Sequence, residues 1–263
     1  ASVRRAIFDM IVSAGRGHIG GSLSCVDILV SLYSGHALRF DPQKPQWPDR
    51  DRFILSKGHA CEALYAVLAD NGFFPVDVLK TYGKPGTILG GHVDNNIPGI
   101  DVSTGSLGHG LGIGAGIALS ARLDMKDFIT FVLMGDGECY EGSIWEAAMF
   151  ASHNHLSNLI AIVDRNKQIT LDFTEDCNRL EPFDEKWRSF GWNVVTLDGN
   201  DHEALLTAFY NLRKRQTNRP TVFIANTIKG KGVSFMEGNL SWHHNLPKGN
   251  QIEIARNDLG FNG

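Results

Sequence analysis

The chain has 263 residues, a formal net charge of −4 and a sequence pI of about 6.2. Nucleic-acid binding needs a basic surface that neutralises phosphates, so this charge argues against a nucleic-acid partner. Hydrophobic residues make up 43% and charged residues 21%, as in ordinary globular proteins, and no apolar run of about 18 residues predicts a membrane span.

The amino-terminal part of the chain shows helical patterns. Residues 2–14 have a helix-like distribution of apolar side chains. In the segment SLSCVDILVSLY (22–33), Ser24 is followed three residues later by Asp27, an arrangement similar to a capping box. The sequence therefore predicts an apolar helix that begins close to Ser24.

Two further helices are predicted before the middle of the chain. Residues 58–72 form a helical pattern that Gly72 would end. Residues 108–123 combine glycines with apolar residues. Because the small residues recur with helical spacing, we expect a helix packed closely against a neighbouring backbone rather than a flexible loop.

Continuous apolar runs with many β-branched residues predict four buried strands, at residues 128–136, 158–166, 192–199 and 220–227. Helical patterns at 143–154 and 201–216 alternate with them. This alternation indicates a doubly wound α/β fold, with a mainly parallel sheet and helices on both faces. Residues 167–190 and the tail after Lys229 are predicted to be irregular, the former as a long loop at the active site.

Polar residues stand where two of these strands end. Asp136, within Gly-Asp-Gly, follows the first strand, and Asn166 closes the second. Ligands bind beyond the carboxyl ends of parallel strands, so both side chains are expected in one crevice if the strands are neighbours. One carboxylate and one amide suit Mg²⁺ shared with a phosphate. Gly137 and the helix near Gly142 would bring backbone N–H groups to a bound diphosphate.

The histidines provide a second signal. Of the ten, five directly follow a glycine, whereas chance predicts about one with 29 glycines in 263 residues. These five are His18, His36, His59, His92 and His109. A single histidine is more often structural than catalytic, and His36 is predicted to be structural, but the group favours loops that line a site.

Several other kinds of site are excluded by missing motifs. The sequence has no Gly-x-Ser-x-Gly elbow, no His-Glu-x-x-His pair and no phosphate-binding Gly-x-x-x-x-Gly-Lys-Ser/Thr loop. The four cysteines are far apart and form no Cys-x-x-Cys pair. This favours reduced thiols in a cytoplasmic protein over a zinc site or a disulfide framework.

Five motifs in order, spread between about residues 17 and 244, resemble those of the transketolase family. They are GHIGGSLS, DRFILSKGHACEALYAVLADNG, TGSLGHGLGIGAG, GDGECYEGSIWEAAMFA and KGKGVSFMEGNLSWHH. The chain resembles the amino-terminal subunit of a split, two-subunit transketolase. The resemblance implies that residues 1–263 form a single domain that binds thiamine diphosphate and Mg²⁺.

The resemblance also assigns roles around the cofactor. Asp136 and Asn166 would bind Mg²⁺ through their side chains, and Gln168 through its carbonyl. The cofactor itself would contact His59, Gly105, Leu107, His109, Gly137, Asn166 and His243. Many full-length transketolases have Gln where His109 stands. In WHHN, His243 aligns with the family histidine, with His244 as the alternative.

For the reaction, the resemblance implies two-carbon ketol transfer from a ketose to an aldose. His18 and His92 would face the sugar and handle protons or hydroxyls, and Glu141 would support the cofactor across a subunit interface. The family glutamate at the aminopyrimidine comes from a pyrimidine-binding domain, which this sequence does not contain. We therefore expect a carboxyl-terminal partner subunit, an α₂β₂ assembly and no activity from the chain alone.

Two alternatives remain from the sequence. The first is another thiamine enzyme, either the α subunit of a 2-oxoacid dehydrogenase or a protein similar to deoxyxylulose-phosphate synthase. The second is a diphosphate-binding module without catalysis. Which sugars are used, and whether they are phosphorylated, is not specified by the sequence.

Overall fold

The computed structural model describes residues 1–214 and 217–261. Its sheet has the strand order β1-β2-β3-β5-β4, and all neighbouring pairs are parallel. The strands are β1 (Arg52–Leu55), β2 (Thr130–Gly135), β3 (Leu159–Arg165), β4 (Asn193–Asp198) and β5 (Thr221–Asn226). The four predicted strands are confirmed, and β2, β3 and β5 are buried as expected. The prediction of burial is wrong for β4, which is partly exposed because it is an edge strand of the sheet. Strand β1 was not predicted, because four residues between charged neighbours are too few to show a pattern.

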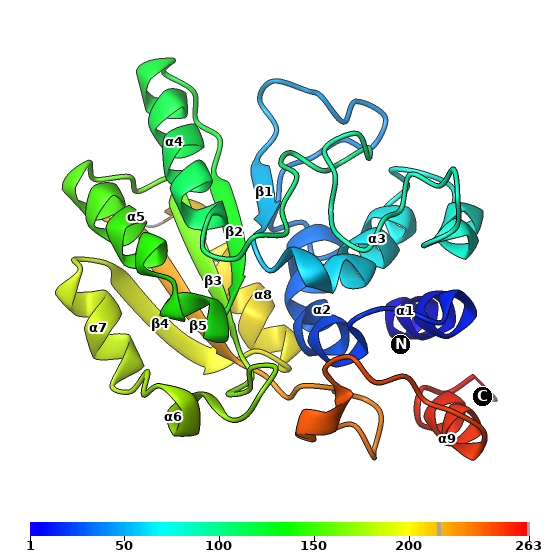
Figure 1. Ribbon diagram of the computed structural model, residues 1–263. Helices are drawn as coiled ribbons and strands as arrows, with labels where there is room; N and C mark the ends of the chain where they lie inside the picture. The colour runs from blue at the N-terminus through cyan, green and yellow to red at the C-terminus, as the bar shows by residue number, and fades with distance from the viewer. Residues whose placement is uncertain (215–216, 262–263) are drawn as a thin grey trace.

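Helices cover both faces of the sheet, which confirms the doubly wound α/β fold (Figure 1). One side holds α1 (Ser2–Ala14), α2 (Ile19–Tyr33), α3 (Cys61–Asp70) and α8 (His202–Tyr210). The other holds α4 (Gly110–Leu123), α5 (Gly142–His153) and α7 (Phe183–Ser189). Successive strand residues point to opposite faces of the sheet. Phe131 and Leu133 pack in the first hydrophobic core, which contains residues of α1, α2, α3 and α8. Val132 and Met134 pack in the second core, which contains residues of α4, α5 and α7.

The remaining helical segments are short or lie near the carboxyl terminus. They are α6 (Thr174–Cys177), α9 (Asn250–Asp258), and the 3₁₀ segments η1 (Gly58–Ala60), η2 (Val76–Thr81), η3 (Gly137–Tyr140), η4 (Leu212–Lys214) and η5 (Leu240–Trp242). The predicted helix 201–216 therefore changes to a 3₁₀ segment after Tyr210, and residues 215–216 lie outside the described residues. In the described parts of the chain, no helix combines the length and apolarity needed to cross a membrane.

The predicted capping box at Ser24 is wrong. Helix α2 begins five residues earlier, at Ile19, and runs through Ser24. The hydroxyl of Ser24 donates to the Asp164 carboxylate at 2.7 Å, so it makes a tertiary contact instead of a cap. A Cβ on Gly20 would lie 2.5 Å from the carbonyl oxygen of Trp242, so this glycine permits close packing inside the helix.

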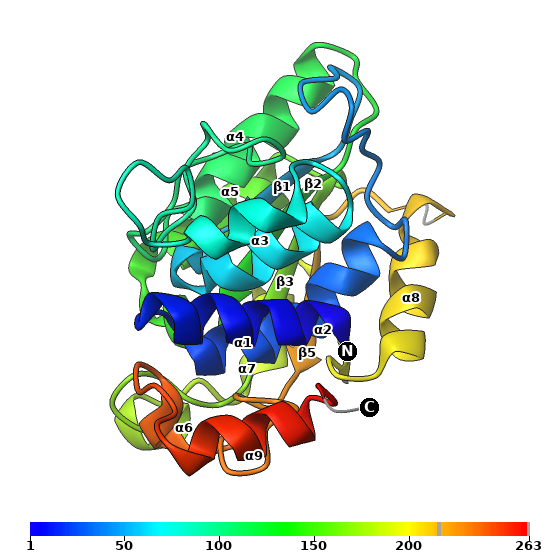
Figure 2. The same cartoon turned by 90° about the vertical axis from the view of Figure 1, so that its right-hand side faces the viewer.

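The two segments predicted to be irregular contain helices. In 167–190, Phe183 and Trp187 lie four residues apart, and both are buried against the second core. This spacing gives α7 an apolar face among charged residues. In the tail, α9 lies beside α1 (Figure 2), where Arg256 donates to Asp9 at 2.6 Å. Residues 168–171 do line a cavity, as expected of an active-site loop.

Helix α4 packs closely on the sheet through a glycine. A Cβ on Gly114 would lie 2.5 Å from Cγ2 of Val132 on β2, whereas a Cβ on Gly116 would have no neighbour within 4 Å. The predicted helix and its close packing are therefore confirmed, but Gly114 faces side chains of the sheet rather than the backbone that we expected. Gly110, at the start of the helix, lies closer still to its neighbour, since an added Cβ would be 2.2 Å from Ser56 Oγ.

This difference gives a matched test of the packing. Gly114→Ala should lower the free energy of unfolding by about 1–3 kcal/mol, because α4 must move away from β2. Gly116→Ala should raise it by up to about 1 kcal/mol, because alanine favours helix without a clash. Urea unfolding of both variants checks the prediction, and equal effects at the two positions would contradict it.

Candidate functional site

A cavity of about 420 Å³ lies beyond the carboxyl ends of the strands. This volume is in the range of small-molecule sites. It collects most of the site residues predicted from the sequence, namely His18, His59, Gly105, Leu107, Asp136, Gly137, Asn166, Gln168 and His243. Strands β2 and β3 are neighbours, so Asp136 and Asn166 share one crevice as expected.

A buried ion pair joins the segments that surround this cavity. Lys57, just after β1, donates from Nζ to Asp164 of β3 at 2.5 Å and to the carbonyl of Gly21 in α2 at 3.2 Å. The Asp164 carboxylate also accepts from Ser24 and from Thr227, which follows β5. Burial by itself would lower the pKa of Lys57, but the charge of Asp164 outweighs it, so the pKa is raised and the ammonium stays charged.

A second buried carboxylate, Glu138 of η3, joins three loops at the cavity wall. It accepts hydrogen bonds from the hydroxyl of Ser56, from Gly108 N at 2.9 Å and from Gly135 N at 3.1 Å. Burial raises the pKa of Glu138 despite these donors. The residue fixes the 105–108 loop, which contains Gly105 and Leu107, against the ends of β1 and β2.

Asp136 and Asn166 have their oxygens positioned by backbone donors. The Asp136 carboxylate accepts from Gly137 N at 2.8 Å and Lys167 N at 2.6 Å, and Asn166 Oδ1 accepts from Gln168 N at 3.1 Å. Burial, and then the charge of Asp164, raises the pKa of Asp136 to about 6. A bound cation would favour the ionised form, so this environment suits a metal ligand.

Of the two backbone segments predicted to approach a diphosphate, Gly137 lines the cavity, but the helix start near Gly142 does not. The cavity is lined by η3, from Gly137 to Tyr140, and Gly142 at the start of α5 lies outside its lining. A 3₁₀ turn intervenes because Glu138 folds back onto the end of β2. A Cβ on Gly137 would lie 2.4 Å from the Ile169 side chain, so only glycine fits there.

Lys229 places a positive charge in the cavity wall. Its Nζ donates to the carbonyl of Ile169 at 3.2 Å and lies 2.9 Å from Nδ1 of His243. Among the described residues no carboxylate forms an ion pair with it. Burial, and then the charge of Lys57, lowers the pKa of Lys229 to about 8. A buried ammonium without a carboxylate is a ready partner for an anion.

Three histidines of the cavity, His18, His59 and His243, are held in the neutral form. Burial is the largest cause, and neighbouring lysines and imidazoles add to it: the pKa is lowered to about 4 for His18 and to about 3 for His243, and well below its ordinary value for His59. At neutral pH each of these rings therefore has an unprotonated nitrogen that can accept a hydrogen bond.

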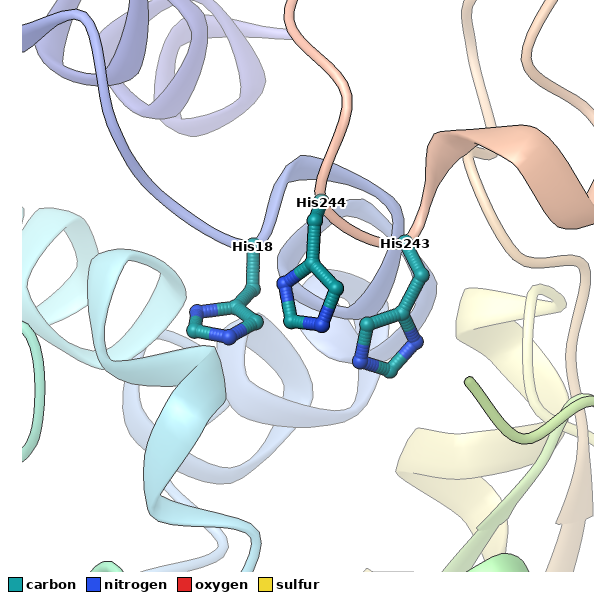
Figure 3. Close-up of side chains that lie close together, drawn as sticks. All are labelled: His18, His243 and His244. Carbon is teal, nitrogen blue, oxygen red and sulfur yellow. The ribbon is translucent and has the colours of Figure 1, made fainter. Parts of the chain in front are cut away.

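His18, His243 and His244 lie side by side (Figure 3) and all line this cavity. Each offers a ring nitrogen, and these nitrogens lie within 4.8 Å of one another. Together with His18, His244, left as an alternative from the sequence, also lines a second cavity. His92 lines the second cavity, and its ring centroid is 6.2 Å from that of His18.

Two predicted site residues lie outside the linings of both cavities. His109 is exposed and precedes α4, and Glu141 is exposed and precedes α5. The stem of Glu141 lies against Gly108, where an added Cβ would be 2.6 Å from Glu141 Cβ. Both residues therefore flank the 105–108 loop.

Two lysines of the cavity, Lys57 and Lys229, were not predicted from the sequence. Each follows the carboxyl end of a strand, as Asp136 and Asn166 do. The same reasoning applied to β1 and β5 would have identified them, but β1 was not recognised and the tail after β5 was treated as irregular. Asp164 was overlooked because its position inside an apolar strand suggested no function.

Comparison with known proteins identifies the family. The family model described as "Transketolase, thiamine diphosphate binding domain" matches residues 1–263. The chain belongs to the transketolase family. The resemblance noted in the sequence is confirmed, and the fold of the chain is that of the thiamine diphosphate-binding domain of transketolases.

Relatives include subunits of two-component transketolases. The chain is 44% identical to one subunit of the apulose-4-phosphate transketolase of Phocaeicola vulgatus, over 96% of this chain and 89% of that protein. It is also 44% identical to the 6-deoxy-6-sulfo-D-fructose transketolase subunit SqwG of a Clostridium species, over 92% of this chain and 88% of that protein.

Full-length transketolases match over part of their length. Human transketolase is 39% identical, over 93% of this chain and 39% of the human protein. A crystal structure of a transketolase variant from Pichia stipitis superimposes with a TM-score of 0.90 and 32% identity, covering 98% of this chain and 40% of that one. The chain thus spans about 40% of the length of the solved transketolases.

The ion pair beneath the cavity can be tested by removing one partner. Lys57→Met should lower the free energy of unfolding by about 3–5 kcal/mol, because it leaves a buried carboxylate without its cation. Lys57→Met combined with Asp164→Asn should be less destabilised than the single variant. Urea unfolding measures both, and a loss below about 1 kcal/mol, the value for an exposed pair, would contradict this role.

The neutral histidines predict acid sensitivity. The unfolded rings bind protons near their ordinary pKa of 6.5, but folded His18 and His243 do so only near about 4 and about 3. Stability is therefore full above the unfolded pKa and falls as the pH drops below it. After allowance for partial solvent exposure, each ring should lower the free energy of unfolding by about 1 kcal/mol as the pH falls from about 7 to about 5.

Urea unfolding across this pH range, for the wild type and for His18→Asn, checks this dependence. The variant should lose stability less steeply with falling pH. His155→Asn, which replaces an exposed histidine, is the control and should follow the wild type. A His18→Asn curve parallel to that of the wild type would refute the assignment.

Proposed function

We propose that the chain is the amino-terminal subunit of a two-subunit transketolase. Paired with a carboxyl-terminal subunit, it transfers a two-carbon ketol unit from a ketose to an aldose. The observation that carries this proposal is the single cavity that combines the Asp136–Asn166 pair, the ammonium of Lys229 and neutral histidines. The subunit names of relatives that match along nearly the whole chain support the division of the enzyme into two polypeptides.

In this proposal, Mg²⁺ binds between the ends of β2 and β3. Asp136 and Asn166 provide side-chain oxygens, and the backbone carbonyl of Gln168 completes the protein ligands. One carboxylate is a small ligand charge for a divalent cation, so the ion needs phosphate oxygens as well. This requirement agrees with a cavity whose lining also contains the ammonium of Lys229.

The diphosphate end of the cofactor would lie against Lys229, His59 and His243, with Gly137 allowing close approach. Gly105 and Leu107 would lie along the rings. An anion here opposes the positive charges that lower the imidazole pKa values, so binding should raise the pKa of His243 toward its ordinary range. Cofactor binding would in this way bring the pKa values of the nearby imidazoles closer to neutral pH.

Thiamine diphosphate supplies the electron sink for cleavage of the carbon–carbon bond when it is bound. This chain's part is to bind, orient and move protons. His18 stands at the boundary of the two cavities, where a sugar would meet the cofactor, and His92 lies beside it. Their imidazoles would accept hydrogen bonds or protons from sugar hydroxyls.

The partner subunit would contribute the pyrimidine-binding domain and the glutamate that faces the aminopyrimidine. Exposed His109 and Glu141 flank the 105–108 loop, so we assign them to the boundary between this chain and its partner. We propose an α₂β₂ assembly in the cytoplasm, with no activity from this chain alone.

Ketol transfer from fructose to an aldose, measured with thiamine diphosphate and Mg²⁺, tests the proposal. Transfer is expected from the chain with its carboxyl-terminal partner and not from the chain alone. Transfer by the lone chain would refute the need for a partner glutamate. Decarboxylation of a 2-oxoacid instead would support the dehydrogenase alternative, and cofactor binding without either reaction would support a non-catalytic module.

Cofactor affinity gives a second measurement on the same preparation. Asp136→Asn should weaken Mg²⁺-dependent binding of thiamine diphosphate at least about 10-fold, equivalent to about 1.4 kcal/mol, because it removes the one ligand charge. Asp198→Asn, at the carboxyl end of the edge strand β4, is the matched control and should bind normally. Calorimetric titration measures both, and equal affinity of Asp136→Asn and wild type would contradict the metal site.

A further inference from the structure

Three imidazoles come together from two segments that are far apart in the sequence. His18 directly precedes α2, whereas His243 and His244 directly follow η5 (Figure 3). Within the part of the chain that the structure describes, this is the only group of three histidine, cysteine or acidic side chains whose ligand atoms are close enough to share one ion. His244 is exposed, so an ion can reach the group from solvent.

The backbones that carry these rings are held together by contacts outside the group. Gly230 N donates to the carbonyl of Gly20 in α2 at 3.1 Å, and a Cβ on Gly20 would lie 2.5 Å from the carbonyl oxygen of Trp242. Trp242 is buried and directly precedes the histidine pair. The tail after β5 therefore packs on α2 without help from a ligand. An ion that binds ligands already assembled loses little affinity to ordering them.

Imidazole nitrogens select one class of metal ion. They suit Zn²⁺, Ni²⁺ and Cu²⁺, whereas Mg²⁺ takes oxygen ligands. In a tetrahedral site with bonds of about 2.0–2.1 Å, two nitrogens lie about 3.4 Å apart. The nitrogens of the three rings lie within 4.8 Å of one another, so rotation of the side chains is enough to bring them to one ion.

The protonation state of the rings also favours an ion. Nδ1 of His18 is buried and has no hydrogen-bond partner among the described residues. Burial lowers the pKa of His18 to about 4 and that of His243 to about 3. At neutral pH an ion therefore does not have to displace a proton from a charged imidazolium.

One cation opposes binding. Nζ of Lys229 lies 2.9 Å from Nδ1 of His243, and Oγ1 of Thr170 lies 3.2 Å from Nε2 of the same ring. An ion bound by His243 displaces one of these partners, and the ammonium repels it. The group therefore suits an ion that bonds strongly to nitrogen, and Lys229 limits its affinity.

We propose that His18, His243 and His244 form a binding site for one transition-metal ion of the Zn²⁺ class, in addition to the proposed Mg²⁺ site. The ion occupies rings that the proposed function assigns to the sugar and the diphosphate, so it inhibits ketol transfer. Mg²⁺ does not relieve this inhibition, because it prefers oxygen ligands.

Titration of the untagged chain with Co²⁺, without cofactor or partner, tests the site directly. Co²⁺ replaces Zn²⁺ and absorbs visible light in a tetrahedral nitrogen site. One equivalent should bind, and Zn²⁺ should abolish the absorption. His244→Asn should lower the Co²⁺ affinity at least about 10-fold, because one of three protein ligands is lost. His155→Asn replaces an exposed histidine outside the group and should match the wild type. Absence of the absorption, or equal affinity of His244→Asn and wild type, would overturn the site.

The opposing charge gives a variant with an effect of the other sign. Lys229→Gln should raise the Co²⁺ affinity about 10-fold, because it removes the cation beside His243. Lys231→Gln, at a partly exposed lysine of the same tail that pairs with Glu237, is the control and should leave the affinity unchanged. Damage to the fold cannot produce tighter binding. Weaker binding by Lys229→Gln would contradict the proposed arrangement.

Inhibition of the assembled enzyme separates this inference from the proposed function. With excess Mg²⁺ present, the Zn²⁺ concentration that halves the rate of ketol transfer should be at least about 10-fold higher for His244→Asn than for the wild type. Equal inhibition of both would reject the site as its cause. Co²⁺ binding by the chain without any ketol transfer would support the site and count against the proposed function. Ketol transfer without Co²⁺ binding would do the reverse.

Discussion

The ion pair between Lys57 and Asp164 is the interaction on which the rest of the site depends. It joins the segment after β1 to β3, and through Ser24 and Thr227 it ties in α2 and the segment after β5. A buried pair is costly to desolvate unless its remaining lone pairs and protons are satisfied. Here hydroxyl and carbonyl groups from other segments do so, and the same bonds fix the positions of the strand ends that surround the cavity.

Above this ion pair, the cavity is lined by charged groups, and only some of them are paired with other groups of the chain. Asp164 is fully engaged, whereas Asp136 and Lys229 keep capacity for further partners. The histidines between them are neutral because burial and nearby cations oppose their charged form. The result is a cavity that can bind a cation at Asp136 and an anion at Lys229, with neutral imidazoles that can accept hydrogen bonds.

The sequence was informative where a local pattern and a general rule coincide. Apolar runs predicted four strands, and the rule that parallel strands end at a common edge brought Asp136 and Asn166 together. It was less informative where tertiary contacts decide: Ser24 bonds Asp164 rather than capping a helix, and α7 forms because Phe183 and Trp187 find a core to bury in. Lys57 and Lys229 were missed because their strands were too short or their surroundings too irregular to interpret.

The buried ammonium of Lys229, which has no carboxylate partner among the described residues, affects how the sequence can evolve. Substitutions that replace this ammonium with an apolar side chain would relieve a desolvation cost and make the isolated polypeptide more robust. The same substitutions would remove the anion partner in the cavity wall. Selection for heat tolerance alone would therefore favour loss of this lysine, and its persistence in a variant library would indicate that ligand binding, rather than folding, is under selection.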